Sequence, residues 1–290
     1  MQFGISLPPF AEFSDVRVLA QLAQEAEAAG WDGFFIWDHM IFDPTWYPNC
    51  DPWVGLTAVA MQTKRMRLGT MVTPLPRRRP WKLARETTSV DRLSDGRLIL
   101  GVGIGDPAKW EYGFFGEATE AKVRAQKLDE GLDILQGLWS GDMFSYAGTH
   151  YQLDEVKFLP CPQQSPRIPV WVAGVWPNKP PLRRAARWDG VFALGSEGAT
   201  LTSDTWHEIR AYIERHRTAD GAFEYVHGGA SSGTNTAEAT DAVAPYADAG
   251  VTWWLEDISP WRFGWKWEEP WSPEASERMR ERVQQGPPRL

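Results

Sequence analysis

Short runs of apolar residues alternate along this chain with longer stretches whose apolar residues recur at helical spacing. Short apolar runs are typical of buried strands, and a spacing of three to four residues is typical of amphipathic helices. The pattern predicts strands at residues 3–8, 33–37, 66–73, 97–102, 170–173, 190–194, 223–227 and 251–256. It predicts helices at about residues 14–29, 52–63, 80–95, 118–139, 180–188, 203–219, 236–249 and 273–284.

Local signals mark the ends of several elements. We expect Ser14 to cap the first helix, because its hydroxyl can accept from the exposed N–H groups of the first turn. Gly30 is expected to end that helix in the left-handed conformation. Between the fourth and fifth strands the alternation breaks, and residues 144–153 predict a small hairpin with Gly148 in its turn.

Eight strand–helix units predict an α/β protein built on a parallel sheet. A chain of this length with eight units is expected to form a single-domain (β/α)8 TIM barrel over residues 1–290, with a small insertion between strands 4 and 5. A doubly wound open sheet is the structural alternative. Leu7-Pro8-Pro9 follows the first strand, where a dinucleotide-binding sheet carries a glycine-rich turn, so the barrel is favoured.

Composition narrows the class of protein. The chain is 43% hydrophobic and carries a formal net charge of −8, so we expect no broad basic face and no nucleic-acid partner. No basic leader is present and no stretch approaches a membrane span, so we expect neither a signal peptide nor a membrane partner. Cys50 and Cys161 fit neither a disulfide framework nor a zinc site, which predicts a reduced, cytoplasmic protein.

Tryptophan is unusually frequent. The chain has 17, and six of them fall between Trp253 and Trp271. Tryptophan combines a large apolar area with one hydrogen-bond donor. Two interpretations therefore stay open for this stretch: ordinary packing, or an aromatic wall around a flat, apolar ligand.

Polar residues stand where several predicted strands end, which is where barrels of this kind carry their functional groups. Asp38 and His39 follow the strand at 33–37, and a carboxylate beside a histidine can tune proton exchange near neutral pH. His227 and Asp257 end two later strands. Together these four residues could serve a metal-dependent hydrolase, but the set is thin, and we predict no metal site.

Glycines follow the fourth predicted strand. The segment from Gly101 to Gly105 contains Gly103 and lacks the second half of a dinucleotide-binding fingerprint. Its glycines would let a planar ring approach the backbone, and the alternative is tight packing inside the barrel.

Basic residues follow two other strands. Gly174 and Val175 lead into the helix predicted from about residue 180, and the backbone N–H groups at its start, together with Lys179, could cradle a phosphate. Arg183 and Arg184 lie one turn further along. The run from Arg77 to Arg79 could contact an anionic cofactor tail, and the alternative, a solvated loop, is favoured for at least two of the three.

Taken together, these segments resemble the luciferase-like monooxygenase family, whose members are flavin- and deazaflavin-dependent oxidoreductases on a (β/α)8 barrel. The stretches that carry the resemblance are 31–39, 67–70, 93–105, the hairpin, 169–174 and 185–190. The resemblance implies a flavin-type ring at the strand ends, with FMN or coenzyme F420 as the cofactor. It also implies that the chain forms a homodimer.

The resemblance assigns roles to individual residues. His39 matches the family's acid/base histidine, and Asp38 matches a carboxylate that lies near the cofactor and is expected to orient His39. Met71-Val72 falls where the family's third strand often has a bulge or a non-proline cis peptide bond. The cofactor-binding residues implied are Asp38, Thr70, Met71, Val72, Gly103, Gly105, Ala173, Gly174, Val175 and Gly195, the last three near the phosphate.

The leading hypothesis is therefore an FMN- or F420-dependent oxidoreductase that carries out hydride transfer or monooxygenation on a small, apolar molecule. A barrel that binds a flavin without turnover is the second hypothesis, and the metal-dependent hydrolase is the third. The residues do not choose between FMN and F420, although the arginine run would suit an acidic cofactor tail.

Overall fold

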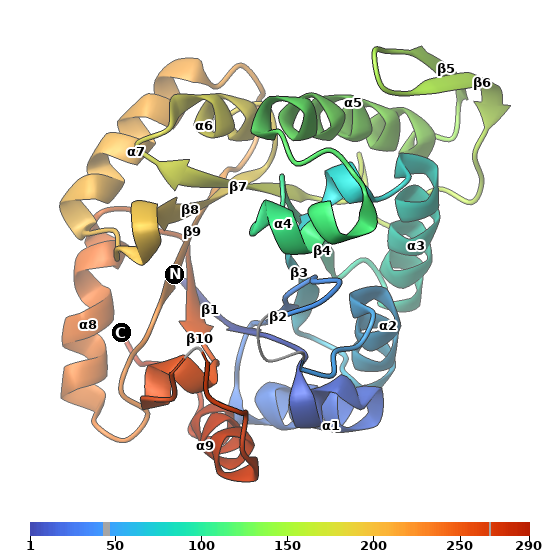
Figure 1. Cartoon of the computed structure of the whole chain (residues 1–290). Helices are drawn as coiled ribbons and strands as arrows, with labels where there is room; N and C mark the ends of the chain where they lie inside the picture. Colours follow the sequence, from blue (N-terminus) through green and yellow to red (C-terminus); the bar gives the residue numbers. More distant parts are fainter. Residues whose placement is uncertain (43–46, 267) are drawn as a thin grey trace.

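The strands of this computed structural model, which describes residues 1–42, 47–266 and 268–290, close into a barrel (Figure 1). The strand order round the barrel is β1-β10-β9-β8-β7-β4-β3-β2, and all neighbours pair in parallel. The barrel strands are β1 (Gln2–Leu7), β2 (Gly33–Ile36), β3 (Arg67–Pro74), β4 (Leu98–Gly103), β7 (Val170–Trp176), β8 (Gly190–Gly195), β9 (Glu224–Gly229) and β10 (Trp253–Asp257). The predicted (β/α)8 barrel is confirmed, and the open sheet is wrong.

Helices surround the barrel (Figure 1). They are α1 (Val16–Ala29), α2 (Pro52–Gln62), α3 (Pro80–Leu93), α5 (Ala121–Trp139), α6 (Lys179–Ala185), α7 (Ser203–His216), α8 (Thr236–Asp248) and α9 (Pro273–Gln284). Short helical turns fill the loops: α4 (Ala108–Glu111) and the 3-10 turns η1 (Ala11–Ser14), η2 (Leu75–Arg77), η3 (Gly113–Phe115), η4 (Ser196–Gly198) and η5 (Pro260–Phe263). In the described part of the chain, no helix has the length and apolar content needed to cross a bilayer.

The start of α1 differs from the expectation by one residue. Asp15, not Ser14, caps the helix, because its carboxylate accepts the backbone N–H of Arg17 at 2.9 Å. Ser14 belongs to η1, and its hydroxyl donates to the carbonyl oxygen of Ala11 at 2.6 Å. The expected end is confirmed, since Gly30 adopts the left-handed conformation with φ of 98°.

The predicted hairpin is present and projects beyond the end of α5 (Figure 1). Its strands, β5 (Met143–Ala147) and β6 (Gln152–Lys157), pair antiparallel and reach further than residues 144–153. The carboxylate of Glu130 on α5 ties down the turn, because it accepts the backbone N–H groups of Thr149, His150 and Tyr151. The insertion is thus anchored to the barrel's helical ring.

Side chains fill the barrel from the inside. The inner core consists of Phe35, Met71, Ile99, Trp171, Phe192, Val226, Trp253 and Leu255. Glycines let neighbouring strands approach: a Cβ on Gly101 would lie 2.1 Å from the carbonyl oxygen of Thr70 on β3. Gly101 is therefore explained by tight packing between β3 and β4. The functional end of the barrel lies beyond Gly101, toward the carboxyl ends of the strands.

Candidate functional site

Three polar groups of neighbouring strands face inward at the carboxyl end of the barrel. Ser6 of β1 and Asp257 of β10 are paired in register, and Trp37 follows β2 directly. The indole N–H of Trp37 donates to the Ser6 hydroxyl at 3.1 Å. Asp257 lies two residues beyond Leu255 of the inner core and so faces the same way. Burial raises the pKa of its carboxyl to about 6.

Asp38 is 2% exposed and is surrounded by cations. Arg77 and Arg78 both pair with its carboxylate, Arg78 at 2.9 Å, and the Thr73 hydroxyl donates to it at 2.9 Å. Burial alone would raise the pKa of Asp38, but the guanidiniums of Arg78 and Arg77 hold that pKa below its ordinary value. The carboxylate is therefore a charged, structural centre of the loops above β2 and β3.

His39 points to a different carboxylate. Its Nδ1 lies 2.6 Å from Oε1 of Glu111, which is 1% exposed and ends α4. Arg77 donates from Nε to the other oxygen of Glu111 at 2.8 Å and so links the two carboxylates. The expectation that Asp38 orients His39 is wrong: successive side chains of an extended segment point to opposite sides, and Glu111 holds the imidazole instead.

Sequence reasoning missed Glu111 because it lies 72 residues from His39 and in a four-residue helix. The one signal for it is its position, since it sits in the loop that follows the fourth strand, at the functional end of the barrel. Figure 1 shows α4 beside the barrel opening.

The imidazole of His39 is also enclosed by aromatic rings. Phe10, Trp37 and Phe42 have their ring centroids 6.0, 5.9 and 5.8 Å from that of His39. Within the described residues, no hydrogen bond reaches Nε2 of His39, whose side chain is 16% exposed. A histidine with Nδ1 fixed by a carboxylate and Nε2 open can take up or release a proton at Nε2.

The arginine run is not a solvated loop, as was favoured for at least two of its members. The side chains of Arg77 and Arg78 are 5% and 13% exposed, and both are held in ion pairs with Asp38 or Glu111. Their positive charge is already matched inside the protein. Only Arg79, which precedes α3, is exposed. This run therefore offers little to an anionic cofactor tail.

An apolar wall lies toward the carboxyl ends of β3, β4 and β7. The peptide bond between Met71 and Val72 is cis, and the pairing of β3 with β4 shifts register between Thr70 and Thr73. The expected bulge is thus confirmed. Val72 packs on the inner core next to Ala173, and a Cβ on Gly103 would lie 2.9 Å from Cγ2 of Val72.

Other residues expected to bind the cofactor have different surroundings. Thr70 is fully buried, and its hydroxyl donates to the carbonyl oxygen of Gly101 at 3.0 Å. Gly105 forms a turn with φ of 78° against Tyr112. Gly174 lies within β7 and faces α6, because a Cβ there would lie 2.9 Å from Cβ of Pro181. These three residues can reach a ligand only through their backbone.

The expected phosphate cradle at the start of α6 is poor in donors. Pro180 and Pro181 occupy its first turn and have no backbone N–H. The ammonium of Lys179 lies 3.3 Å above the ring of Trp176, and Arg184 pairs with Asp129 at 2.6 Å. Gly195, at the end of β8, remains, and a Cβ on it would lie 1.8 Å from the carbonyl oxygen of Ala199.

His227 does not join the site. It lies outside the barrel, where Trp206 of α7 donates to its Nδ1 at 3.0 Å and its ring stacks on Tyr246 of α8 at 4.2 Å. Burial lowers the pKa of His227 to about 4. No cluster of three or more His, Cys, Asp and Glu side chains suited to a metal ion occurs among the described residues. The four-residue site of the hydrolase hypothesis is therefore not formed.

The tryptophan-rich stretch divides between the two interpretations. Trp253 packs inside the barrel and Trp254 outside it, as ordinary core residues. Trp261 of η5 stacks on Trp37 at 5.7 Å with an interplanar angle of 19°, so it belongs to the aromatic rim of the opening. Trp267 lies outside the described residues.

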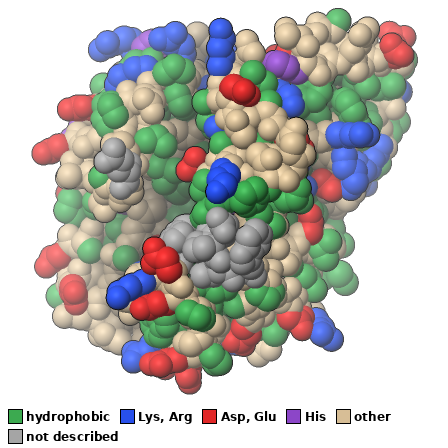
Figure 2. Space-filling view, in the orientation of Figure 1, with side chains coloured by type: hydrophobic (Ala, Val, Ile, Leu, Met, Phe, Trp, Pro, Cys, Tyr) green, Lys and Arg blue, Asp and Glu red, His purple; other side chains and the backbone are tan. Residues whose placement is uncertain are grey.

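Figure 2 shows acidic and basic side chains scattered over the face seen in Figure 1.

A parallel eight-stranded barrel with a histidine–carboxylate pair at its carboxyl end defines a class, the (β/α)8-barrel proteins with a proton-exchanging group at the opening. The chain belongs to the luciferase-like monooxygenase family, whose family model matches residues 1–285.

The relatives with known activities use two kinds of cofactor. An F420-dependent glucose-6-phosphate dehydrogenase of Gordonia bronchialis is 34% identical over 223 residues, 74% of this chain and 63% of the relative. The oxygenase component of a flavin-dependent trigonelline monooxygenase of Acinetobacter baylyi is 32% identical over 160 residues, 55% of this chain and 43% of the relative. The matched part of the chain thus spans less than two thirds of either relative.

A solved structure supports the fold. The coenzyme F420 dependent tetrahydromethanopterin reductase of Methanopyrus kandleri superposes with a TM-score of 0.74, and the match covers 98% of each chain at 17% identity.

Proposed function

We propose that this protein is an oxidoreductase that uses FMN or coenzyme F420 for hydride transfer to or from, or monooxygenation of, a small, apolar molecule. The observation that carries the proposal is the His39–Glu111 pair, which stands at the carboxyl end of the barrel, the end at which Val72, Gly103 and Ala173 form an apolar wall. Membership of the family and the cofactors in the names of the relatives support it. A barrel without turnover would not require a buried proton-exchanging pair.

The residues present fit a flat ring. Gly103 lets Val72 pack closely against β4, and Met71, Ala173 and Val175 supply apolar surface on the neighbouring strands. Backbone groups near Gly195 are the candidates for the phosphate. When bound, the ring would supply the redox chemistry that amino-acid side chains lack.

The chain's own residues then handle the proton. His39 would hold or release it at Nε2, while Glu111 fixes the imidazole through Nδ1. Arg77 keeps Glu111 in place, and Asp38 in turn keeps Arg77 in place. The rings of Phe10, Trp37 and Phe42 exclude water from the imidazole, which favours transfer to a bound ligand over exchange with solvent.

The test is an absorbance titration of the purified protein with FMN and with F420. We expect saturable binding of at least one of them, and at least tenfold weaker binding by Gly103→Val, whose side chain would displace Val72 from the apolar surface. Gly116→Val is the matched control, because a Cβ at Gly116 meets nothing within 4 Å, although its φ of 71° adds local strain. Binding of neither cofactor by the native chain would overturn the proposal.

We also propose that the protein acts in the cytoplasm as a homodimer. Cys50 and Cys161 are free thiols, which suits a reducing compartment. Helix α2 has no charged residue, and Val54 and Met61, two turns apart on one face, are 57% and 70% exposed. A helix that is apolar all round is typically covered, and a second copy of α2 would cover this one.

Substituting Met61 with glutamate is expected to convert the dimer to a monomer at micromolar concentration, because two buried carboxylates would face each other across the interface. Analytical ultracentrifugation measures the change. Met143→Glu is the control, since Met143 is 57% exposed on the hairpin, away from α2. A native chain that is monomeric at the same concentration would contradict the dimer.

A further inference from the structure

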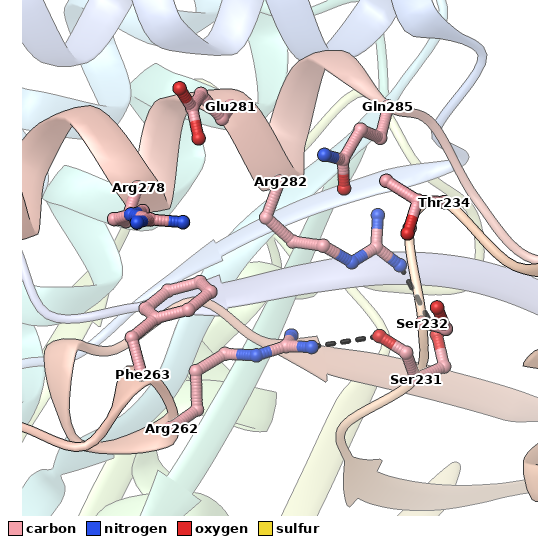
Figure 3. Close-up of a pocket in the computed structure, with 10 residues that line it drawn as sticks. Ser231, Ser232, Thr234, Arg262, Phe263, Arg278, Glu281, Arg282 and Gln285 are labelled. Carbon is pink, nitrogen blue, oxygen red and sulfur yellow. Dashed lines mark hydrogen bonds between the residues drawn. The ribbon is translucent and has the colours of Figure 1, made fainter.

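A cavity lies between η5, the loop after β9 and the last helix α9. Its volume is about 190 Å³, and three segments far apart in sequence line it: the loop after β9, η5 and the last helix α9 (Figure 3). The lining includes the arginines Arg262, Arg278 and Arg282, and most of its other side chains are hydroxyls or amides. A cavity so rich in hydrogen-bond donors differs from the apolar wall of the barrel opening.

The floor of the cavity is a buried ion cluster. Glu256 is fully buried and pairs with both Arg262 and Arg282, at 2.5 and 3.3 Å. The backbone N–H and the hydroxyl of Ser231 also donate to this carboxylate, each at 2.8 Å. The two guanidiniums share this carboxylate, and the carboxyl of Asp257 also interacts electrostatically with Arg262. The floor is also rigid, because each of its members has partners on other segments.

The wall of the cavity carries donors that the described residues leave unused. Arg278 is exposed and has no ion pair or hydrogen bond within the described part of the chain. The side chains of Thr234 and Gln285 likewise form no hydrogen bond among the described residues, and Figure 3 shows them on the same side of the cavity. Glu281 also lines it, and its carboxylate is the one acidic group at the rim.

Donors that converge from several directions suit a tetrahedral oxyanion. A guanidinium has five N–H donors and no acceptor, and it binds phosphate oxygens in pairs. The volume of 190 Å³ far exceeds the roughly 30 Å³ of a water molecule, so a phosphoryl group with part of its parent molecule fits. The position agrees as well, because phosphate sites in these barrels often follow the seventh and eighth strands, here β9 and β10.

We propose that this cavity binds the phosphoryl group of a small phosphorylated molecule, with the guanidinium of Arg278, unpaired among the described residues, and the side chains of Thr234 and Gln285 as ligands above the floor of Arg262, Arg282 and Glu256. Arg262 directly follows Trp261, which stacks on Trp37 at the barrel opening. This site does not depend on the redox proposal, because its donors are distinct from those of the cofactor wall.

The test is isothermal titration calorimetry of the full chain with inorganic phosphate and with glycerol phosphate, and with glycerol as the blank. We expect both phosphates to bind, with about tenfold weaker binding to Arg278→Gln and tighter binding to Glu281→Gln. Arg215→Gln, which removes an exposed arginine of α7, is the charge-matched control and should not change the affinity.

Titration of Arg278→Gln with FMN and F420 identifies the source of the phosphoryl group. An equal loss of cofactor affinity would assign the cavity to the cofactor's phosphate, and an unchanged affinity would assign it to a separate ligand. Either result supports the site. The absence of phosphate binding at 10 mM, or an affinity that Arg278→Gln leaves unchanged, would overturn it, and neither result bears on whether the barrel binds a flavin.

Discussion

Replacing His39 with alanine is expected to lower kcat/KM by roughly 10²–10⁴-fold, the range that a positioned acid/base group contributes. The imidazole is fixed by Glu111 at one nitrogen and open at the other, so its removal leaves a proton without a carrier. Cofactor binding should persist, because the apolar wall of Val72 and Ala173 is untouched. Steady-state kinetics across pH, together with cofactor titration, separates the two effects.

Glu111→Gln makes the experiment sharper. The amide can still accept from the imidazole, but it brings a neutral group in place of the carboxylate beside Arg77, so we expect a smaller loss of rate and a displaced pH profile. Glu117→Gln is the matched control, because Glu117 is exposed six residues further along. A His39→Ala rate equal to that of the native chain near neutral pH would remove His39 from the mechanism.

The second large effect concerns stability. Asp38→Asn is expected to lower the free energy of unfolding by about 3–5 kcal/mol, because it leaves two largely buried guanidiniums without their shared counter-ion. Urea denaturation followed by circular dichroism measures the loss. Asp15→Asn, which weakens an exposed pair with Arg17, is the control and should change the midpoint little.

The pH dependence gives an independent check on Asp38. Its pKa is below the ordinary value in the folded protein, so the unfolded chain binds the proton first as pH falls. The stabilisation is therefore fully present above the unfolded pKa of about 4 and is lost as pH falls through the folded pKa. Asp38→Asn should remove this acid-dependent loss. An Asn variant as stable as the native chain would show that the ion cluster does not hold the loops together.

The architecture was predictable because its information is local. Each strand–helix unit has its own apolar periodicity and its own residues that start or end the helix, such as Gly30 at the end of α1 and Pro52 at the start of α2. Errors at this level were small: the cap of α1 moved from Ser14 to Asp15, since either side chain can accept from the first turn. β7 continues past the predicted end at Ala173 to Trp176.

The partners of charged groups were not predictable in the same way. Asp38 and His39 are neighbours in sequence, yet their side chains diverge to Arg78 and Glu111. The sequence suggested that Arg77 belongs to a solvated loop, but the structure buries it between the carboxylates of Asp38 and Glu111. His227 ends a strand as His39 follows one, but its side chain points outward to Trp206, because the alternation along β9 decides the face.

Periodicity along the chain was thus enough to establish the barrel, the hairpin, and the end of the barrel at which His39 stands. The sequence alone did not determine which carboxylate holds His39, which arginines are paired, or where unused donors remain beside α9. These features depend on contacts between distant segments, such as His39 with Glu111, 72 residues apart, and Arg282 with Glu256, 26 residues apart. Such contacts exist only once the barrel has closed, since closure brings loops from different strands together at one end and determines which charges lose their water.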